Sequence, residues 1–187
     1  MIKGFFFDLD GTLVDTHQAN FEAYKRAIFE VSGNEISFED FKKGIGHVAK
    51  TFLPWFAPGL EDADYKRIIS LKAEYYKDLM HLTELNAGLI GLMDAVKEDA
   101  LIVLVTSAKR KNAEAVLAHH NLEKYFDYTI AAEDVGQSKP ATAAYELALQ
   151  KTGLLHHEAI AFEDSEAGKR AAEAAGIAVV MIKSFSA

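Results

Sequence analysis

The chain of 187 residues contains no cysteine, and its acidic side chains outnumber its basic ones. Without thiols it has no disulfide framework, no thiolate zinc site and no thiol nucleophile, and we expect a reducing compartment, the cytoplasm. Lys and Arg number 20 against 28 Asp and Glu, so the formal net charge is −8. This charge opposes a nucleic-acid partner, and an anionic substrate would need a local cation.

Long apolar runs are missing as well. No stretch approaches the roughly 20 apolar residues that a membrane-spanning helix needs, and the first residues hold neither a basic region nor a small-residue cleavage site. We therefore expect an unprocessed protein without a membrane partner, either a monomer or a weak homodimer. The hydrophobic fraction of 50% is ample for a packed interior.

Short apolar runs predict a Rossmann-like parallel sheet of the α/β class. The run at residues 2–7 lacks alternation, which is typical of a strand covered on both faces. From about residue 86 onward such runs alternate with helical patterns, as in repeated strand–helix units. The predicted strands are residues 2–9, 101–105, 128–131, 159–162 and 178–182.

Residues 16–85 follow a different pattern, with amphipathic stretches and no convincing strand. Helices are predicted at residues 17–31, 37–44, 47–56 and 62–82. A connection of this length far exceeds an ordinary loop, which favours a lid or cap over the strand ends. The predicted division is an α/β core of residues 1–15 and 86–187 with an inserted helical cap of residues 16–85.

Two carboxylates, Asp8 and Asp10, end the first predicted strand. Side chains two apart on a strand point to one side unless the chain turns between them, and ligands bind at the carboxyl ends of parallel strands. Gly11 permits a sharp turn, so the backbone amides of Gly11 and Thr12 are predicted to face an anion. The alternative is an Asp-Gly turn that only begins the next helix.

Polar side chains follow three further strands. They are Thr106, Ser107, Lys139, Glu163 and Asp164. Each alone has a structural explanation, such as a helix cap or a solvated charge. Because the carboxyl ends of parallel strands meet at one edge, we expect these side chains to converge with the two aspartates.

Several acids at one edge require a cation. Two carboxylates about 4 Å apart repel by roughly 4 kcal/mol at an effective dielectric constant near 20, and oxygen-only ligands suit magnesium, Mg2+. Asp8 and Asp164 are the best candidate ligands, with Glu163 next. Lys139 and the Thr106 hydroxyl are predicted to cradle a phosphoryl group, whose oxygens carry negative charge.

These motifs resemble those of the haloacid dehalogenase-like hydrolase superfamily, in the branch with a helical cap after the first motif. The matching segments are Asp8-Leu9-Asp10-Gly11-Thr12-Leu13-Val14-Asp15, Thr106-Ser107, Ser138-Lys139-Pro140 and Glu163-Asp164-Ser165. The resemblance implies that Asp8 is a nucleophile forming a phosphoaspartate, with Asp10 as acid and base. It also implies that Thr106 contacts phosphoryl oxygens, that Lys139 stabilises Asp8, and that magnesium binds Asp8, the Asp10 carbonyl and Asp164. The residue pattern alone leaves the choice of nucleophile between Asp8 and Asp10 open.

The second aspartate and the first predicted cap helix help to distinguish between branches of this superfamily. Members that cleave carbon–halogen bonds typically lack the second aspartate, so Asp10 favours phosphate esters. Mutases resembling β-phosphoglucomutase usually carry a histidine where Asn20 stands, with His17 one helical turn earlier. Because an amide cannot shuttle a proton, Asn20 favours hydrolysis, as in phosphoglycolate phosphatases, over transfer between sugar oxygens.

The cap loop also departs from the mutase pattern, which often has an arginine three residues after the loop glycine, Gly46. Ala49 stands there, so His47 and Lys50 are candidate substrate contacts, with exposed helix-start residues as the alternative. The predicted function is a magnesium-dependent phosphatase of a small phosphorylated metabolite. A sugar-phosphate mutase and a non-catalytic module that binds such a metabolite are the alternatives.

Overall fold

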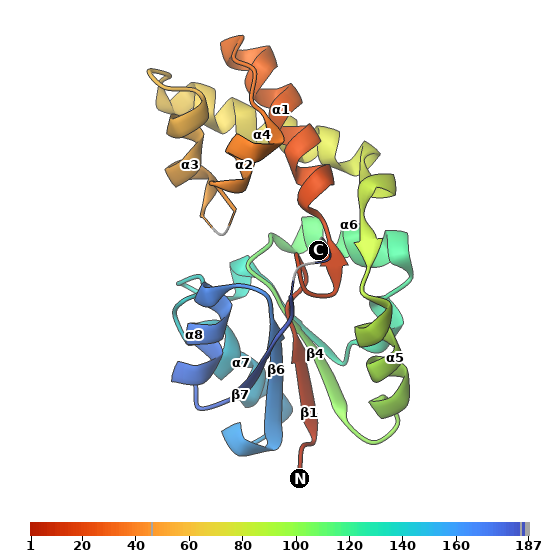
Figure 1. The fold of residues 1–187 in the computed structure, drawn as a ribbon. Coiled ribbons are helices and arrows are strands. Elements are labelled where there is room, and N and C mark those ends of the chain that lie inside the picture. Colours follow the sequence, from red (N-terminus) through yellow and green to blue (C-terminus); the bar gives the residue numbers. More distant parts are fainter. Residues whose placement is uncertain (46, 184, 186–187) are drawn as a thin grey trace. The chain divides into compact units, whose positions relative to one another are not determined.

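A computed structural model describes residues 1–45, 47–183 and 185 (Figure 1). The chain divides into two compact units, one of Met1–Asp15 with Glu84–Ala187 and one of Thr16–Thr83. The loop glycine Gly46 lies outside the described residues. Within the described part of the chain, no helix is both long enough and apolar enough to cross a membrane.

The first unit is built on a five-stranded parallel sheet, which confirms the predicted α/β class. The strands lie in the order β5-β4-β1-β6-β7. They are β1 Gly4–Phe7, β4 Leu101–Val105, β5 Tyr128–Ile130, β6 Ala159–Glu163 and β7 Ala178–Met181. Phe7 at the end of β1 pairs with Leu104 of β4 and Phe162 of β6. The carboxyl ends of these three strands are therefore level with one another.

Helices cover the sheet and bury its aromatic and branched side chains. They are α5 Ala87–Val96, α6 Arg110–His120, α7 Ala143–Thr152 and α8 Glu166–Ala174. In Figure 1, α7 and α8 lie on the opposite side of β1 from α5. The helices α7 and α8 share one core with the sheet, in which Phe6, Val103 and Tyr145 are fully buried. Each such side chain contributes about 1.5–3 kcal/mol to folding.

A second, two-stranded sheet was not predicted. Strand β2, Val14–Asp15, pairs antiparallel with β3, Glu84–Leu85. These strands lie where the chain leaves the first unit and where it returns, so the boundary falls after Thr83 rather than after residue 85. Strands of two residues are too short to show an alternating pattern, which explains why the sequence did not indicate them.

The second unit is helical. Its elements are α1 His17–Ser32, α2 Phe38–Lys42, α3 Ala49–Phe56, α4 Asp62–Asp78 and a 3-10 turn at Met80–Leu82. Helix α1 packs along α4, around a core that includes Phe21, Phe41 and Phe52. The helix predicted at residues 62–82 ends at Asp78, because the last turn tightens to 3-10 geometry as helix ends often do.

Candidate active site

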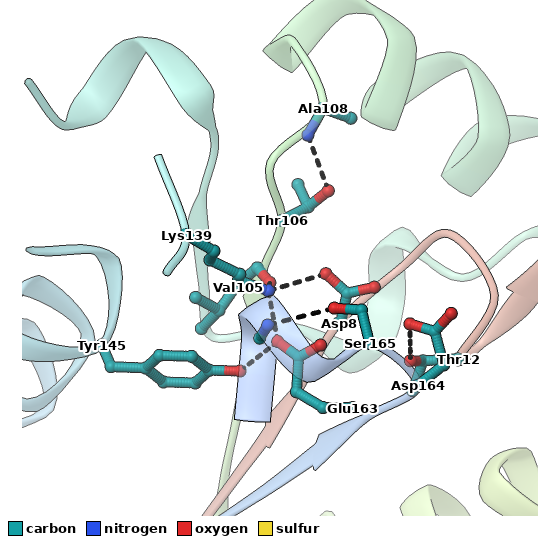
Figure 2. Close-up of polar contacts among 11 residues, drawn as sticks. Asp8, Thr12, Val105, Thr106, Ala108, Lys139, Tyr145, Glu163, Asp164 and Ser165 are labelled. Carbon is teal, nitrogen blue, oxygen red and sulfur yellow. Dashed lines mark hydrogen bonds and ion pairs between the residues drawn. The ribbon is translucent and has the colours of Figure 1, made fainter. Parts of the chain in front are cut away.

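One ammonium group joins the ends of three strands. The Nζ atom of Lys139, in the loop before α7, donates to Asp8 Oδ1 at 2.7 Å and to the Val105 carbonyl at 2.7 Å. Its third acceptor is Glu163 Oε1 at 2.5 Å. Asp8 follows β1, Val105 ends β4 and Glu163 ends β6, so side chains far apart in sequence meet as predicted (Figure 2).

The charged groups of this cluster are withdrawn from solvent. Only 5% of the Lys139 side chain, 11% of Asp8 and 1% of Glu163 are exposed. A lysine ammonium has three donors, and all three are used here. Burying two carboxylates with a single cation is costly unless further partners neutralise the excess charge. Such a cluster of buried charges is a candidate functional site.

Burial and neighbouring charges shift the protonation of the cluster. Burial, followed by the negative charges of Glu163 and Asp164, raises the pKa of Asp8 well above its ordinary value, although Lys139 opposes the shift. Burial alone would lower the pKa of Lys139, but Asp8 and Glu163 outweigh it and raise the lysine pKa. The lysine is therefore an ammonium at neutral pH.

Three carboxylates fit the predicted magnesium ion. Asp8, Glu163 and Asp164 each offer an oxygen, and these oxygens lie within 4.8 Å of one another. The set contains only oxygen donors, as a hard divalent cation requires. Glu163 Oε1 already accepts two hydrogen bonds, whereas its buried Oε2 has no partner within the described residues.

Thr12 supports one of these carboxylates. Its hydroxyl donates to Asp164 Oδ1 at 3.3 Å (Figure 2), and the threonine is fully buried. The prediction that the Gly11 and Thr12 amides face an anion is wrong. The Gly11 amide donates to the Val14 carbonyl at 2.8 Å and the Thr12 amide to the Leu9 carbonyl at 3.3 Å. Both amides close the turn that follows the first motif.

The two aspartates lie at the start of this turn and differ in burial. Gly11 has a φ of 88°, a left-handed conformation that glycine adopts without strain. Asp8 is buried directly after β1, whereas Asp10 lies beyond Leu9 and is partly exposed. The carboxylate of Asp10 is outside the group of three oxygens that could hold a metal. The two acids thus have different surroundings, which suits different chemical roles.

The sequence profile of the haloacid dehalogenase-like hydrolase family matches residues 5–182. The chain belongs to this family. A phosphorylated carbohydrates phosphatase from Thermotoga maritima is 31% identical over 177 residues, covering 91% of this chain and 80% of the relative. A fructose-1-phosphate phosphatase from Escherichia coli is 27% identical and covers 96% of each chain. The crystal structure of CbbY from Rhodobacter sphaeroides in complex with phosphate is 26% identical, with a TM-score of 0.85, covering 99% of this chain and 88% of that one.

The second motif of this hydrolase follows β4. Thr106 is 3% exposed, and its Oγ1 accepts a hydrogen bond from the Ala108 amide at 3.0 Å. The hydroxyl proton of Thr106 remains available as a donor, since that bond uses only a lone pair. The neighbouring Ser107 is exposed.

The other predicted substrate contacts belong to the helical unit. His17 begins α1, and the Asn20 amide nitrogen donates to the Thr16 carbonyl at 3.0 Å and to its hydroxyl at 3.1 Å. His47 and Lys50 are exposed at the start of α3, and the His47 ring lies edge-on to Trp55. Their part in substrate binding stays a prediction.

One residue of the cluster had no sequence signal. The Tyr145 hydroxyl donates to Glu163 Oε1 at 2.5 Å, from the first turns of α7. Tyr145 lies between apolar residues at helical spacing, as any core aromatic does. Only the packing of α7 on the sheet reveals its contact with the fourth motif.

Proposed function

We propose that this haloacid dehalogenase-like hydrolase is a magnesium-dependent phosphatase that hydrolyses a small phosphorylated metabolite through a phosphoaspartate. The observation that carries the proposal is the buried cluster of Asp8, Lys139 and Glu163 beside Asp164. The names of the two relatives, which describe phosphatases of phosphorylated carbohydrates and of fructose 1-phosphate, support a phosphate ester as substrate. The cytoplasmic location stays a prediction.

In the first half of the reaction the Asp8 carboxylate attacks phosphorus. A bond forms between the carboxylate oxygen and phosphorus while the ester P–O bond breaks, and Asp10 gives its proton to the leaving alkoxide. The ammonium of Lys139 and the hydroxyl of Thr106 neutralise charge on the phosphoryl oxygens. Lys139 is already held at Asp8 by the 2.7 Å hydrogen bond, so little reorganisation is needed.

In the second half a water molecule attacks the phosphoaspartate. Asp10 accepts a proton from this water, the bond between Asp8 and phosphorus breaks, and inorganic phosphate and the free carboxylate are restored. Partial exposure gives Asp10 the access to water that this role needs, unlike the buried Asp8.

Asp8, Asp164 and the Asp10 carbonyl would hold the magnesium ion. When bound, it supplies positive charge to the transferring phosphoryl group and compensates the excess of buried carboxylates. Thr12 orients Asp164 for this purpose by donating to Oδ1.

Asn20 bears on the alternative, a sugar-phosphate mutase. Its amide nitrogen donates to both oxygens of Thr16, and an amide does not transfer protons between sugar hydroxyls. Hydrolysis is therefore the better supported reaction. We propose that the helical unit acts as the cap that selects the substrate.

A phosphate-release screen tests the proposal. Wild-type protein is incubated with an aryl phosphate and a panel of phosphorylated metabolites, with magnesium and then with a chelator. We expect release of stoichiometric phosphate that the chelator and the Asp8→Asn substitution both abolish. A mutase would instead keep the phosphoryl label within substrate and product. Absence of turnover across the panel would favour a binding module.

A further inference from the structure

Tyr145 reaches the cluster from the side of α7. It is fully buried, and its hydroxyl donates to Glu163 Oε1, the same oxygen that accepts from Lys139 (Figure 2). The centre of its ring lies 5.3 Å from Lys139 Nζ. Tyr145 thus touches both the lysine and the carboxylate behind it, although it lies outside the motifs that the sequence singled out.

We propose that Tyr145 is a positioning residue, which acts through Glu163 to hold Lys139 against Asp8. The inference rests on the proposed function, in which the ammonium at Asp8 stabilises the transferring phosphoryl group. The tyrosine itself contacts no reacting atom in this scheme.

The surroundings of Glu163 explain why it needs the phenol. The carboxylate is enclosed, and its Oε2 atom has no hydrogen-bond partner within the described residues. An ionised carboxylate offers about four acceptor sites, but here Lys139 and Tyr145 are the donors that reach it. Hydrogen bonds to an ionised acceptor are about twice as strong as neutral ones, so each donor matters.

Glu163 also has no room to turn away. A Cβ atom placed on Gly168 of α8 would overlap its carboxylate group, so that helix closes one side of the group. The hydroxyl of Tyr145 closes another side. The backbone of α8 at Gly168 and the Tyr145 hydroxyl therefore hold the carboxylate in one orientation.

Lys139 is shared between two competing carboxylates. Its Nζ atom lies 2.5 Å from Glu163 and 2.7 Å from Asp8. Without the phenol, Glu163 would depend on the ammonium alone, and the attraction would draw the lysine away from Asp8. The tyrosine hydroxyl donates a hydrogen bond to the Glu163 carboxylate and so weakens its attraction for the ammonium. The ammonium then stays close to Asp8.

The substitution Tyr145→Phe isolates the hydroxyl, because phenylalanine keeps the ring that faces Lys139. We expect kcat to fall about tenfold, equivalent to about 1.4 kcal/mol, with KM changed less than twofold. Tyr125→Phe is the matched control, since Tyr125 is 9% exposed and its hydroxyl donates to Asp94 at 3.0 Å in the same unit. We expect the control to keep both constants within twofold. Equal kcat values for the two variants would overturn the proposal.

A double-mutant cycle tests whether the effect passes through Glu163. In a Glu163→Gln background no carboxylate charge remains to be shared, so Tyr145→Phe is expected to lower kcat less than twofold. The same tenfold fall in both backgrounds would show that Tyr145 acts by another route. Tyr145→Met lacks both the hydroxyl and the ring and is expected to lower kcat at least tenfold, which keeps the test decisive if Tyr145→Phe does not fold.

Crystal structures of wild type and Tyr145→Phe separate this inference from the proposed function. We expect the distance from Lys139 Nζ to Asp8 Oδ1 to lengthen in the variant, and an unchanged distance would overturn the positioning role. If wild type released no phosphate yet the lysine moved, the proposed function would fail and the positioning role would stand. If wild type released phosphate and Tyr145→Phe released it at the same rate, the positioning role would fail and the proposed function would stand.

Discussion

Gly168→Ala is the substitution whose effect follows most directly from the packing behind the cluster. Gly168 is buried in α8, and a Cβ atom there would overlap the carboxylate carbon and both oxygens of Glu163. The obstacle is the centre of a carboxylate held by Lys139 and Tyr145, so it cannot yield as the tip of a flexible side chain would. The substitution must therefore displace Glu163 or shift α8.

The magnitude follows from what Glu163 would lose. Breaking a buried ion pair costs about 3–5 kcal/mol, and replacing glycine by alanine within a helix returns about 1 kcal/mol. We expect Gly168→Ala to lower the free energy of unfolding by about 2–4 kcal/mol. We also expect a loss of phosphatase activity, because Lys139 would no longer be fixed.

Urea denaturation with Gly91→Ala as control measures this effect. Gly91 lies within α5, it is exposed, and a Cβ atom there would meet nothing within 4 Å. Alanine at position 91 is expected to stabilise the protein by about 1 kcal/mol, the helix propensity difference alone. Gly168→Ala matching the stability of Gly91→Ala would refute the reasoning. In a Glu163→Ala background, where the obstacle is gone, Gly168→Ala is expected to stabilise the protein by about 1 kcal/mol, as Gly91→Ala does.

Two further predictions concern the carboxylates. Because burial raises the pKa of Asp8, the folded protein binds this proton more tightly than the unfolded chain, so stability is lost as pH rises from about 4 through the raised pKa. With chelator present, the unfolding free energy of wild type should decrease more steeply than that of Asp8→Asn as pH rises. Parallel curves for the two proteins would contradict a raised pKa at Asp8. Magnesium at 100 times its dissociation constant should stabilise wild type by about 2.7 kcal/mol. In thermal unfolding this gain should vanish in Asp164→Ala and weaken in Thr12→Val, and an undiminished gain in Asp164→Ala would exclude it as a ligand.

The sequence predicted the parts of this site that depend on strand order. Strand β4 has the predicted bounds, residues 101–105. Its apolar run ends clearly, since the polar residues Thr106 and Ser107 follow it. The carboxyl ends of parallel strands lie at one edge of the sheet. This rule was enough to predict that Asp8, Lys139 and Glu163 lie close together. The pairing of Phe7 with Leu104 and Phe162 has the register that this reasoning requires.

The parts that failed depend on local geometry that a residue pattern does not encode. The Gly11 amide was predicted to face an anion, yet the turn folds back so that it meets the Val14 carbonyl. Glycine permits many turns, and which one forms depends on the strand pairing that follows at Val14–Asp15. Likewise, nothing within α7 distinguishes Tyr145 from a purely apolar core residue, because its hydrogen bond is made to a residue 18 positions away.

The two adjacent acids at the end of β6 have different hydrogen-bond partners, although an oxygen of one lies within 4.8 Å of an oxygen of the other. The Glu163 side chain is buried and accepts hydrogen bonds from Lys139 and Tyr145. Asp164 is partly exposed and meets Thr12 of the first motif instead (Figure 2). Two acids that look equivalent in the sequence thus differ: Glu163 binds the lysine, and Asp164 is the one to which the proposed function assigns the cation. The sequence ranked Glu163 after Asp8 and Asp164 as a metal ligand, and its two hydrogen bonds give the physical reason for assigning it to the lysine.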